Sequence, residues 1–73
     1  MSESMRKEIA YFKNNGFAIL FTGKSIDDDE YIVAENGGLA FVMRNQGEHS
    51  RKFFIVKLCE PPKAINIAKR HCV

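Results

Sequence analysis

The fold is decided by residues 31–44, which read YIVAENGGLAFVMR. Two runs rich in β-branched and aromatic side chains surround the triplet Asn36-Gly37-Gly38. Strands favour such side chains, and the residues of this triplet readily adopt the positive φ angles of a tight turn. The stretch therefore predicts a β-hairpin.

A short helix over residues 26–35 is the alternative for the first half of this stretch. Ser25 and Asp28 could cap such a helix, and Gly37 could end it. The strand is favoured because the consecutive residues Tyr31-Ile32-Val33 lose side-chain freedom in a helix and form no single apolar stripe there.

The residues before the hairpin predict a helix and a strand. Apolar residues recur at helical spacing between about residues 4 and 15, so they share one face of a helix. Gly16 can end this helix in a left-handed conformation. Residues 17–22 are aromatic and aliphatic and lie between two glycines, which is typical of a buried strand.

The residues after the hairpin predict a further strand and a second helix. Residues 51–59 predict a fourth strand, in which both alternating rows are largely apolar, and Pro61-Pro62 cannot continue a central strand. Pro62 suits the first turn of a helix that extends toward the C-terminus. The expected fold is an α+β domain with an N-terminal helix, a small antiparallel sheet of three or four strands and a short C-terminal helix.

Length and composition limit the class of protein. The 73 residues, 45% of them hydrophobic, predict a single domain over residues 1–73 with a real core but marginal stability. Self-association would add stability, so a homodimer is one expectation.

The net charge of +2 does not require nucleic acid as a partner. The N-terminus lacks a leader pattern and no apolar run has membrane length, which predicts a cytoplasmic protein without membrane contact.

Strand alternation predicts a surplus of apolar surface on the sheet. One row of each strand would lie beneath the helices, with Phe17, Ile19 and Phe21 in the first strand. Both rows of residues 52–58 are apolar, and the row that ends in Lys57 is expected to face outward. A second face of this kind predicts a protein interface with an apolar centre and a basic rim. The expected contact residues are Leu20, Val42, Phe53 and Ile55 at the centre, with Arg44, Arg51 and Lys57 at the rim.

The alternative is that the C-terminal helix crosses to the second face and covers it. Phe53 and Ile55 would then be ordinary core residues. Isolated exposed apolar residues are common, and only a contiguous patch marks an interface. The sequence also leaves open whether the partner is a second copy of the chain or another protein.

The polar stretch before the hairpin predicts an acidic loop of Asp27, Asp28, Asp29 and Glu30. Adjacent acids lack the alternating spacing and the turn glycine of a calcium loop, so no metal is expected there. A solvated loop is the ordinary expectation. Its functional use would be a small negative surface that steers a basic partner.

The remaining reactive groups predict no catalytic residue, no metal and no cofactor. Cys59, His71 and Cys72 would supply three zinc ligands, whereas a structural site needs four in paired spacing. Cys72 has no third residue to orient it with its neighbour His71. The Gly-Lys-Ser at residues 23–25 lacks the first glycine of a phosphate-binding loop.

Two resemblances concern nucleic acid. The order helix, three strands, helix is similar to that of double-stranded-RNA-binding domains, although Lys63 stands alone where they carry a basic cluster. Residues 9–23, with Asn15-Gly16-Phe17 in the middle, resemble the opening of HicA-type RNA-cleaving toxins, which implies a related architecture. Lys24 and Ser25 stand where those toxins carry a catalytic histidine, so the resemblance implies no catalysis.

The sequence therefore predicts a non-catalytic regulator or inhibitor that acts through a protein interface on an apolar sheet face. Small domains of this kind are common among phage and mobile-element products that block a host protein. The alternative is a module that binds RNA or DNA through a basic patch. That patch would join residues 6–7, 49–52 and 63–71.

Overall fold

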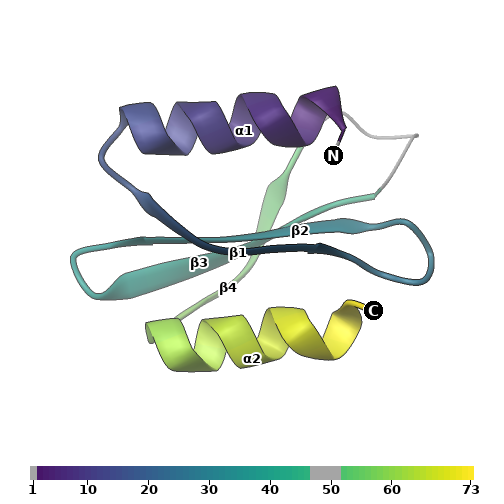
Figure 1. Ribbon diagram of the computed structural model, residues 1–73. Coiled ribbons are helices and arrows are strands. Elements are labelled where there is room, and N and C mark those ends of the chain that lie inside the picture. The colour runs from purple at the N-terminus through teal and green to yellow at the C-terminus, as the bar shows by residue number, and fades with distance from the viewer. Residues whose placement is uncertain (1, 47–51) are drawn as a thin grey trace.

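The computed structural model describes residues 2–46 and 52–73. Four strands, each antiparallel to the next, form one sheet in the order β1-β2-β3-β4 between two helices (Figure 1). The predicted α+β fold is thus confirmed with four strands. The elements are α1 (Glu3–Asn14), β1 (Ala18–Lys24), β2 (Glu30–Asn36), β3 (Leu39–Asn45), β4 (Phe54–Cys59) and α2 (Pro61–His71).

The hairpin of β2 and β3 confirms the turn predicted at the paired glycines. Asn36 pairs with Leu39, so Gly37 and Gly38 form a two-residue turn with φ angles of 63° and 86°. Positive φ at both positions matches the twist of the strands, and glycine adopts it without strain. The alternative helix is wrong, because the same residues form β2.

The two helices cover opposite faces of the sheet. In Figure 1, α1 lies above the strands and α2 lies below them. α1 packs on β1 and β2, whereas α2 packs across all four strands. The C-terminal helix thus crosses to the second face, which was the alternative to a free apolar face. A sheet that is apolar on both faces needs such a cover on each side.

Each helix completes its own core cluster with the sheet. On the α1 side, Met5 is buried together with Ile32 and Met43. On the α2 side, Ala64 and Ala68 are fully buried, and their small side chains let the helix approach the strands closely. Two thin cores therefore replace the single core that the sequence predicted beneath the helices.

A β-bulge in β1 changes the faces that two residues occupy. The register between β1 and β2 shifts between Ile19 and Phe21, so Leu20 is an extra residue. Leu20 and Phe21 both pack against the α2-side cluster, and Thr22 returns to the α1 side. The prediction that Phe21 shares a face with Ile19 is wrong, because an inserted residue reverses the alternation that follows it.

A buried polar cluster ties the N-terminus of α1 to the sheet. The Ser2 hydroxyl caps the helix by accepting a hydrogen bond from the backbone N–H of Met5 at 3.1 Å, and it donates to Glu30 Oε1 at 2.7 Å. Asn45 Nδ2 donates to the same oxygen at 3.3 Å. Glu30 is 4% exposed. Its predicted place in a solvated acidic loop is therefore wrong: Glu30 is a buried residue of β2.

The chain end packs against the end of β1. A Cβ atom at Gly23 would lie 2.8 Å from Cys72 Sγ, so only glycine permits this approach without a shift. The backbone N–H of Val73 donates to the Lys24 carbonyl oxygen at 3.1 Å. These contacts hold the end of α2 beside β1, at the edge of the sheet opposite to β4.

Candidate functional site at the β4 edge

β4 is an edge strand with an exposed apolar surface. It pairs with β3 on one side and lies at the end of the four-stranded order. Its apolar residues are exposed to 43% (Phe54), 52% (Ile55), 43% (Val56) and 51% (Leu58). Edge strands usually carry charge or other features that prevent pairing with foreign strands. We call these four residues the β4 patch.

The β4 patch reaches both faces of the sheet. Ile55 pairs with Met43, and Leu58 pairs with Phe41. Met43 and Phe41 both belong to the α1-side cluster, and paired residues share a face, so Ile55 and Leu58 lie on the α1 side. The neighbouring Phe54 points to the α2 side by alternation. A partner strand would therefore meet apolar side chains above and below the plane of the sheet.

The position of α1 explains why β4 is exposed. α1 packs on β1 and β2, and on its side of the outer strands Leu39 of β3 is also exposed, to 45%. A register shift between Val42 and Met43 leaves Val56 as an extra residue of β4. A bulge and an exposed lysine, here Lys57, both limit indiscriminate edge pairing. The edge is therefore apolar and carries two features that limit pairing with other strands.

The structure places some of the predicted contact residues in or against the core and others on the exposed surface of β4. Val42 is fully buried and Leu20 half-buried in the α2-side cluster, so neither lies at the centre of an exposed face. Phe53 is half-buried against the α1-side cluster. Ile55 and Lys57 are exposed on β4. The predicted rim residue Arg51 lies outside the described residues.

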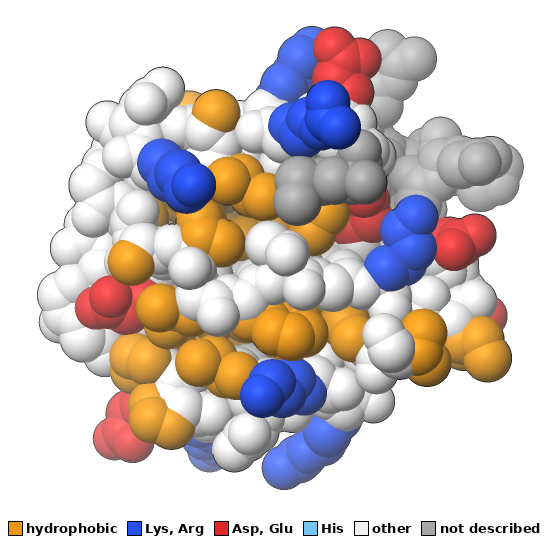
Figure 2. All heavy atoms as spheres, viewed as in Figure 1, with side chains coloured by type: hydrophobic (Ala, Val, Ile, Leu, Met, Phe, Trp, Pro, Cys, Tyr) orange, Lys and Arg blue, Asp and Glu red, His pale blue; other side chains and the backbone are white. Residues whose placement is uncertain are grey.

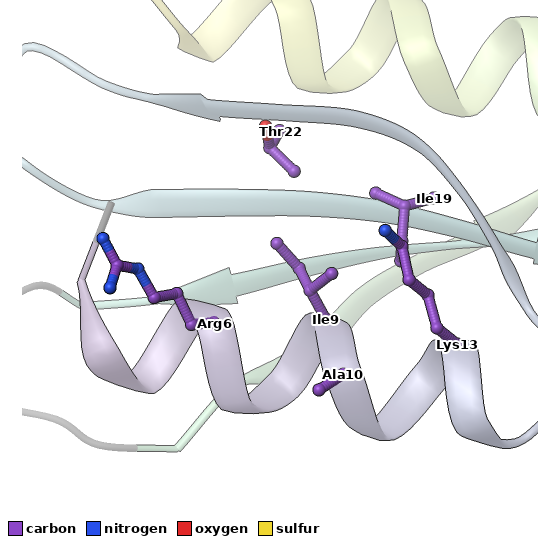
Figure 3. Close-up of a pocket in the computed structure, with 6 residues that line it drawn as sticks. All are labelled: Arg6, Ile9, Ala10, Lys13, Ile19 and Thr22. Carbon is purple, nitrogen blue, oxygen red and sulfur yellow. The ribbon is translucent and has the colours of Figure 1, made fainter.

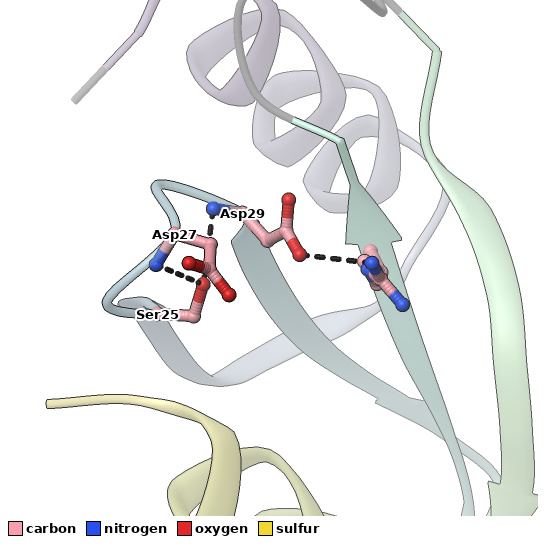
Figure 4. Close-up of polar contacts among 4 residues, drawn as sticks. Ser25, Asp27 and Asp29 are labelled. Carbon is pink, nitrogen blue, oxygen red and sulfur yellow. Dashed lines mark hydrogen bonds and ion pairs between the residues drawn. The ribbon is translucent and has the colours of Figure 1, made fainter.

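The predicted acidic loop and the predicted rim residue Arg44 contact each other. Arg44 Nη2 lies 2.9 Å from Asp29 Oδ2, and both side chains are partly buried (Figure 4). The Ser25 hydroxyl accepts hydrogen bonds from the backbone N–H groups of Asp27 at 3.2 Å and Asp29 at 3.1 Å. Asp27 and Asp28 stay exposed. The exposed acidic surface thus consists of two residues, whereas the sequence predicted four. The positive charge of Arg44 is paired with Asp29 and does not form part of a free basic rim.

The predicted basic patch is not brought together. Arg6 and Lys7 lie on α1 above the sheet, whereas the exposed cations Lys63, Lys69 and Arg70 lie on α2 below it. The sheet separates the two groups. Residues 49–51 of this predicted patch lie outside the described part of the chain. The helical cations of the predicted patch therefore lie on two separate surfaces, one on each side of the sheet.

The reactive side chains near the C-terminus, His71 and Cys72, both make packing contacts with the rest of the domain. Burial raises the pKa of the Cys72 thiol above its ordinary value, and a protonated thiol is a weak nucleophile. The His71 ring stacks on Tyr31 with the ring centroids 5.3 Å apart. Within residues 2–46 and 52–73, no group of three His, Cys, Asp or Glu side chains could hold a metal ion.

Sequence reasoning missed part of the exposed surface. It assigned Phe54, Val56 and Leu58 to the inner row, because the other row contains Lys57. A signal for the correct assignment was present, since strands joined by successive hairpins are usually neighbours in the sheet and the last of them lies at an edge. Because α1 packs on β1 and β2, the α1 side of β4, with Ile55 and Leu58, stays exposed. The sequence did not indicate which faces the helices would cover.

Comparisons with family models, with curated proteins and with solved structures each found no match to this chain. Among the described residues, no helix is long and apolar enough to cross a membrane. The candidate site therefore rests on the geometry of β4 itself.

Proposed function

We propose that this protein is a non-catalytic regulator or inhibitor that binds another protein through the β4 patch. The observation that carries the proposal is the exposure of four large apolar side chains on one edge strand, each to between 43% and 52%. Exposed apolar residues are unremarkable singly, whereas a contiguous set is typical of an interface. Pairing with a strand of the partner would cover these side chains and the free edge together.

The apolar surface available for binding is modest. Full burial of a large aliphatic or aromatic side chain contributes about 1.5–3 kcal/mol. Because each side chain of the β4 patch is already about half covered, completing its burial adds roughly 1 kcal/mol. Main-chain hydrogen bonds between β4 and the partner strand would fix how the two strands are aligned. A partner strand bound there would be withheld from its own pairings, which is how a small domain can inhibit without chemistry.

Charge favours a foreign strand over a second copy of this chain. Lys57 lies next to the middle of β4, which runs from Phe54 to Cys59. A two-fold axis at Lys57 would place the two Lys57 side chains directly opposite each other on one face of the sheet, and like charges paired in this way are destabilising. A strand with an acidic residue opposite Lys57 avoids this repulsion. We therefore assign the partner as an apolar strand that carries an acid.

Substitutions on β4 test this function. The variants Ile55→Asp and Leu58→Asp place a charge in the β4 patch. The matched control is Ile26→Asp, because Ile26 is 82% exposed in the turn between β1 and β2, away from β4. Partners are captured from an extract of the producing cells with each variant, and thermal melting checks that each variant folds. We expect a protein that the parent chain and Ile26→Asp retain and that both β4 variants lose.

Two further measurements decide the assignment. Hydrogen exchange of the purified complex should slow at the amides of residues 54–59, because strand pairing protects them. Exchange that slows elsewhere and leaves β4 unchanged would contradict the proposal, as would a partner retained by both β4 variants. Sedimentation of the parent chain tests whether the partner is a second copy of this chain. A dimer of the parent chain that is lost in Ile55→Asp would show that it is.

A further inference from the structure

An open groove lies between α1 and β1, at the edge of the sheet opposite to β4. Its volume is about 510 Å³. Figure 2 shows hydrophobic side chains between the sheet edge and the upper helix, with Lys and Arg side chains at their border. Figure 3 shows the residues that line the groove, which are Arg6, Ile9, Ala10 and Lys13 of α1 with Ile19 and Thr22 of β1.

The bulge in β1 creates this groove. Because Leu20 is an extra residue, Leu20 and Phe21 both turn to the α2 side. On the α1 side, β1 is left with Ile19 and the small Thr22 where regular alternation would place Phe21. Ala10 on the facing helix is small as well. The groove therefore has an aliphatic floor that no large side chain of residues 2–46 and 52–73 fills.

Two cations stand at the ends of the groove. Arg6 and Lys13 are seven residues apart on α1, which corresponds to about 10 Å along the helix axis. Both are exposed, and within residues 2–46 and 52–73 neither belongs to an ion pair, whereas Lys7 between them pairs with Glu3 at 3.7 Å. The positive charges at the groove therefore have no acid from the described part of the chain to neutralise them.

We propose that this groove binds an acidic peptide segment, with an aliphatic side chain on its floor and a carboxylate at each end. In an extended peptide, alternate residues point to the same side, so carboxylates four residues apart lie about 13 Å from each other with one side chain between them. The long side chains of Arg6 and Lys13 can adjust to this spacing. Charge-assisted hydrogen bonds to the carboxylates would fix the segment in the groove. This site is independent of the β4 patch.

The lining favours a peptide over nucleic acid. Single-stranded nucleic acids are held by aromatic side chains on which bases stack, together with cations along the backbone. Among the described residues, the groove is lined by aliphatic and small side chains, Ile9, Ala10 and Ile19 among them, and by no aromatic residue. An aliphatic side chain fits such a floor, and carboxylates match the two cations.

Binding of defined peptides to the complete chain tests the proposal. An isotope-labelled sample is titrated with a capped peptide that contains Glu-Ser-Leu-Ser-Glu, and NMR amide shifts are followed. We expect shifts at residues 6–13 and 19–22. Peptides with both Glu changed to Gln, or with the Leu changed to Ser, should bind at least about tenfold more weakly, because each loses one of the two kinds of contact.

Protein variants separate the groove from general electrostatics. The double variant Arg6→Gln/Lys13→Gln should weaken peptide binding at least about tenfold. The control Lys7→Gln/Lys63→Gln removes the same charge elsewhere and should leave binding within about twofold of the parent chain. All four positions are exposed, so folding should persist. An equal loss in both variants, shifts outside the groove, or tighter groove binding of a single-stranded oligonucleotide than of the peptide would overturn the proposal.

Discussion

The two edges of the sheet differ in how far the helices cover them. At the β1 edge both helices pack on the strand, and five of its seven residues are half-buried. At the β4 edge five of six residues are exposed, although most of them are apolar. Both strands have similar composition, so composition does not decide which edge is exposed. The placement of two short helices decides it.

Chain connections explain this placement. α1 is joined to β1 by residues 15–17 alone, so it folds back over the strand that follows it. α2 begins directly after β4 but packs across all four strands, and Cys72 next to its end reaches Gly23 of β1. Both helices therefore cover β1. A small domain with two helices can thus protect one edge well and leave the other edge available for binding.

The largest expected effect comes from charge beneath α2. Val42→Asp would place a carboxylate at a position that is fully buried, where an unpaired charge is costly. We expect a loss of about 4 kcal/mol or more in the free energy of unfolding, enough to unfold a domain of this size. Lys57 is the residue of β4 opposite Val42 and is exposed. The control Lys57→Asp should fold normally.

Urea unfolding monitored by circular dichroism measures both variants. A folded Val42→Asp with parental stability would mean that α2 does not seal the second face, and the contrast between the two edges would disappear.

A methyl group at Gly23 should have the next largest effect. The added Cβ would lie 2.8 Å from Cys72 Sγ and 2.9 Å from the Phe21 ring, so the end of α2 would have to move away from β1. Gly23→Ala should cost about 1–3 kcal/mol, the usual range for overpacking. Adding Cys72→Ala to this variant should restore part of the loss in thermal melting. No loss in the single variant would show that α2 is not held against the β1 edge.

The sequence predicts the secondary structure well because local signals decide it. The paired glycines after Asn36 fix the turn, and the branched run before them excludes the helix. The two bulges are not predictable in the same way. Nothing local marks Leu20 or Val56 as an extra residue, because both occur within continuous apolar runs, and only the paired strand reveals the shift.

The candidate site was only partly predictable for a related reason. Ile55 and Lys57 were identified from the doubly apolar strand, and both are exposed. Val42 was assigned to the same face because alternation does not tell which face a helix will cover. The ion pair of Arg44 with Asp29 joins residues fifteen positions apart and depends on strand register. Tertiary placement, not composition, separates core from surface here.

A charge at the β4 edge should affect stability much less than a charge at the β1 edge. Ile55→Asp should cost about 1 kcal/mol, mainly through lower strand propensity, because Ile55 is 52% exposed. Ile19→Asp on β1 should cost clearly more, since Ile19 packs in the α1-side cluster. Urea midpoints of the two variants measure the difference. Equal losses would mean that β4 is as well covered as β1.

The smallest expected effect concerns Glu8, whose carboxyl has a pKa raised above its ordinary 4.5 by burial. Glu8 lies about 200° around α1 from Arg6, on the flank away from the groove and toward the outer strands. The folded state binds this proton more tightly than the unfolded state, so stability should fall as the pH rises from 4.5 through the raised pKa.

Glu8→Gln removes this part of the pH dependence and should be more stable than the parent chain at neutral pH by less than about 0.5 kcal/mol. In acid, where Glu8 is protonated in both states, the stability difference between the two chains should be smaller. Melting curves across this range measure the difference. If the stability difference between Glu8→Gln and the parent chain were the same at every pH, the Glu8 carboxyl would be as well hydrated as a surface group. The flank of α1 that faces the outer strands would then not differ in hydration from the flank that faces the groove.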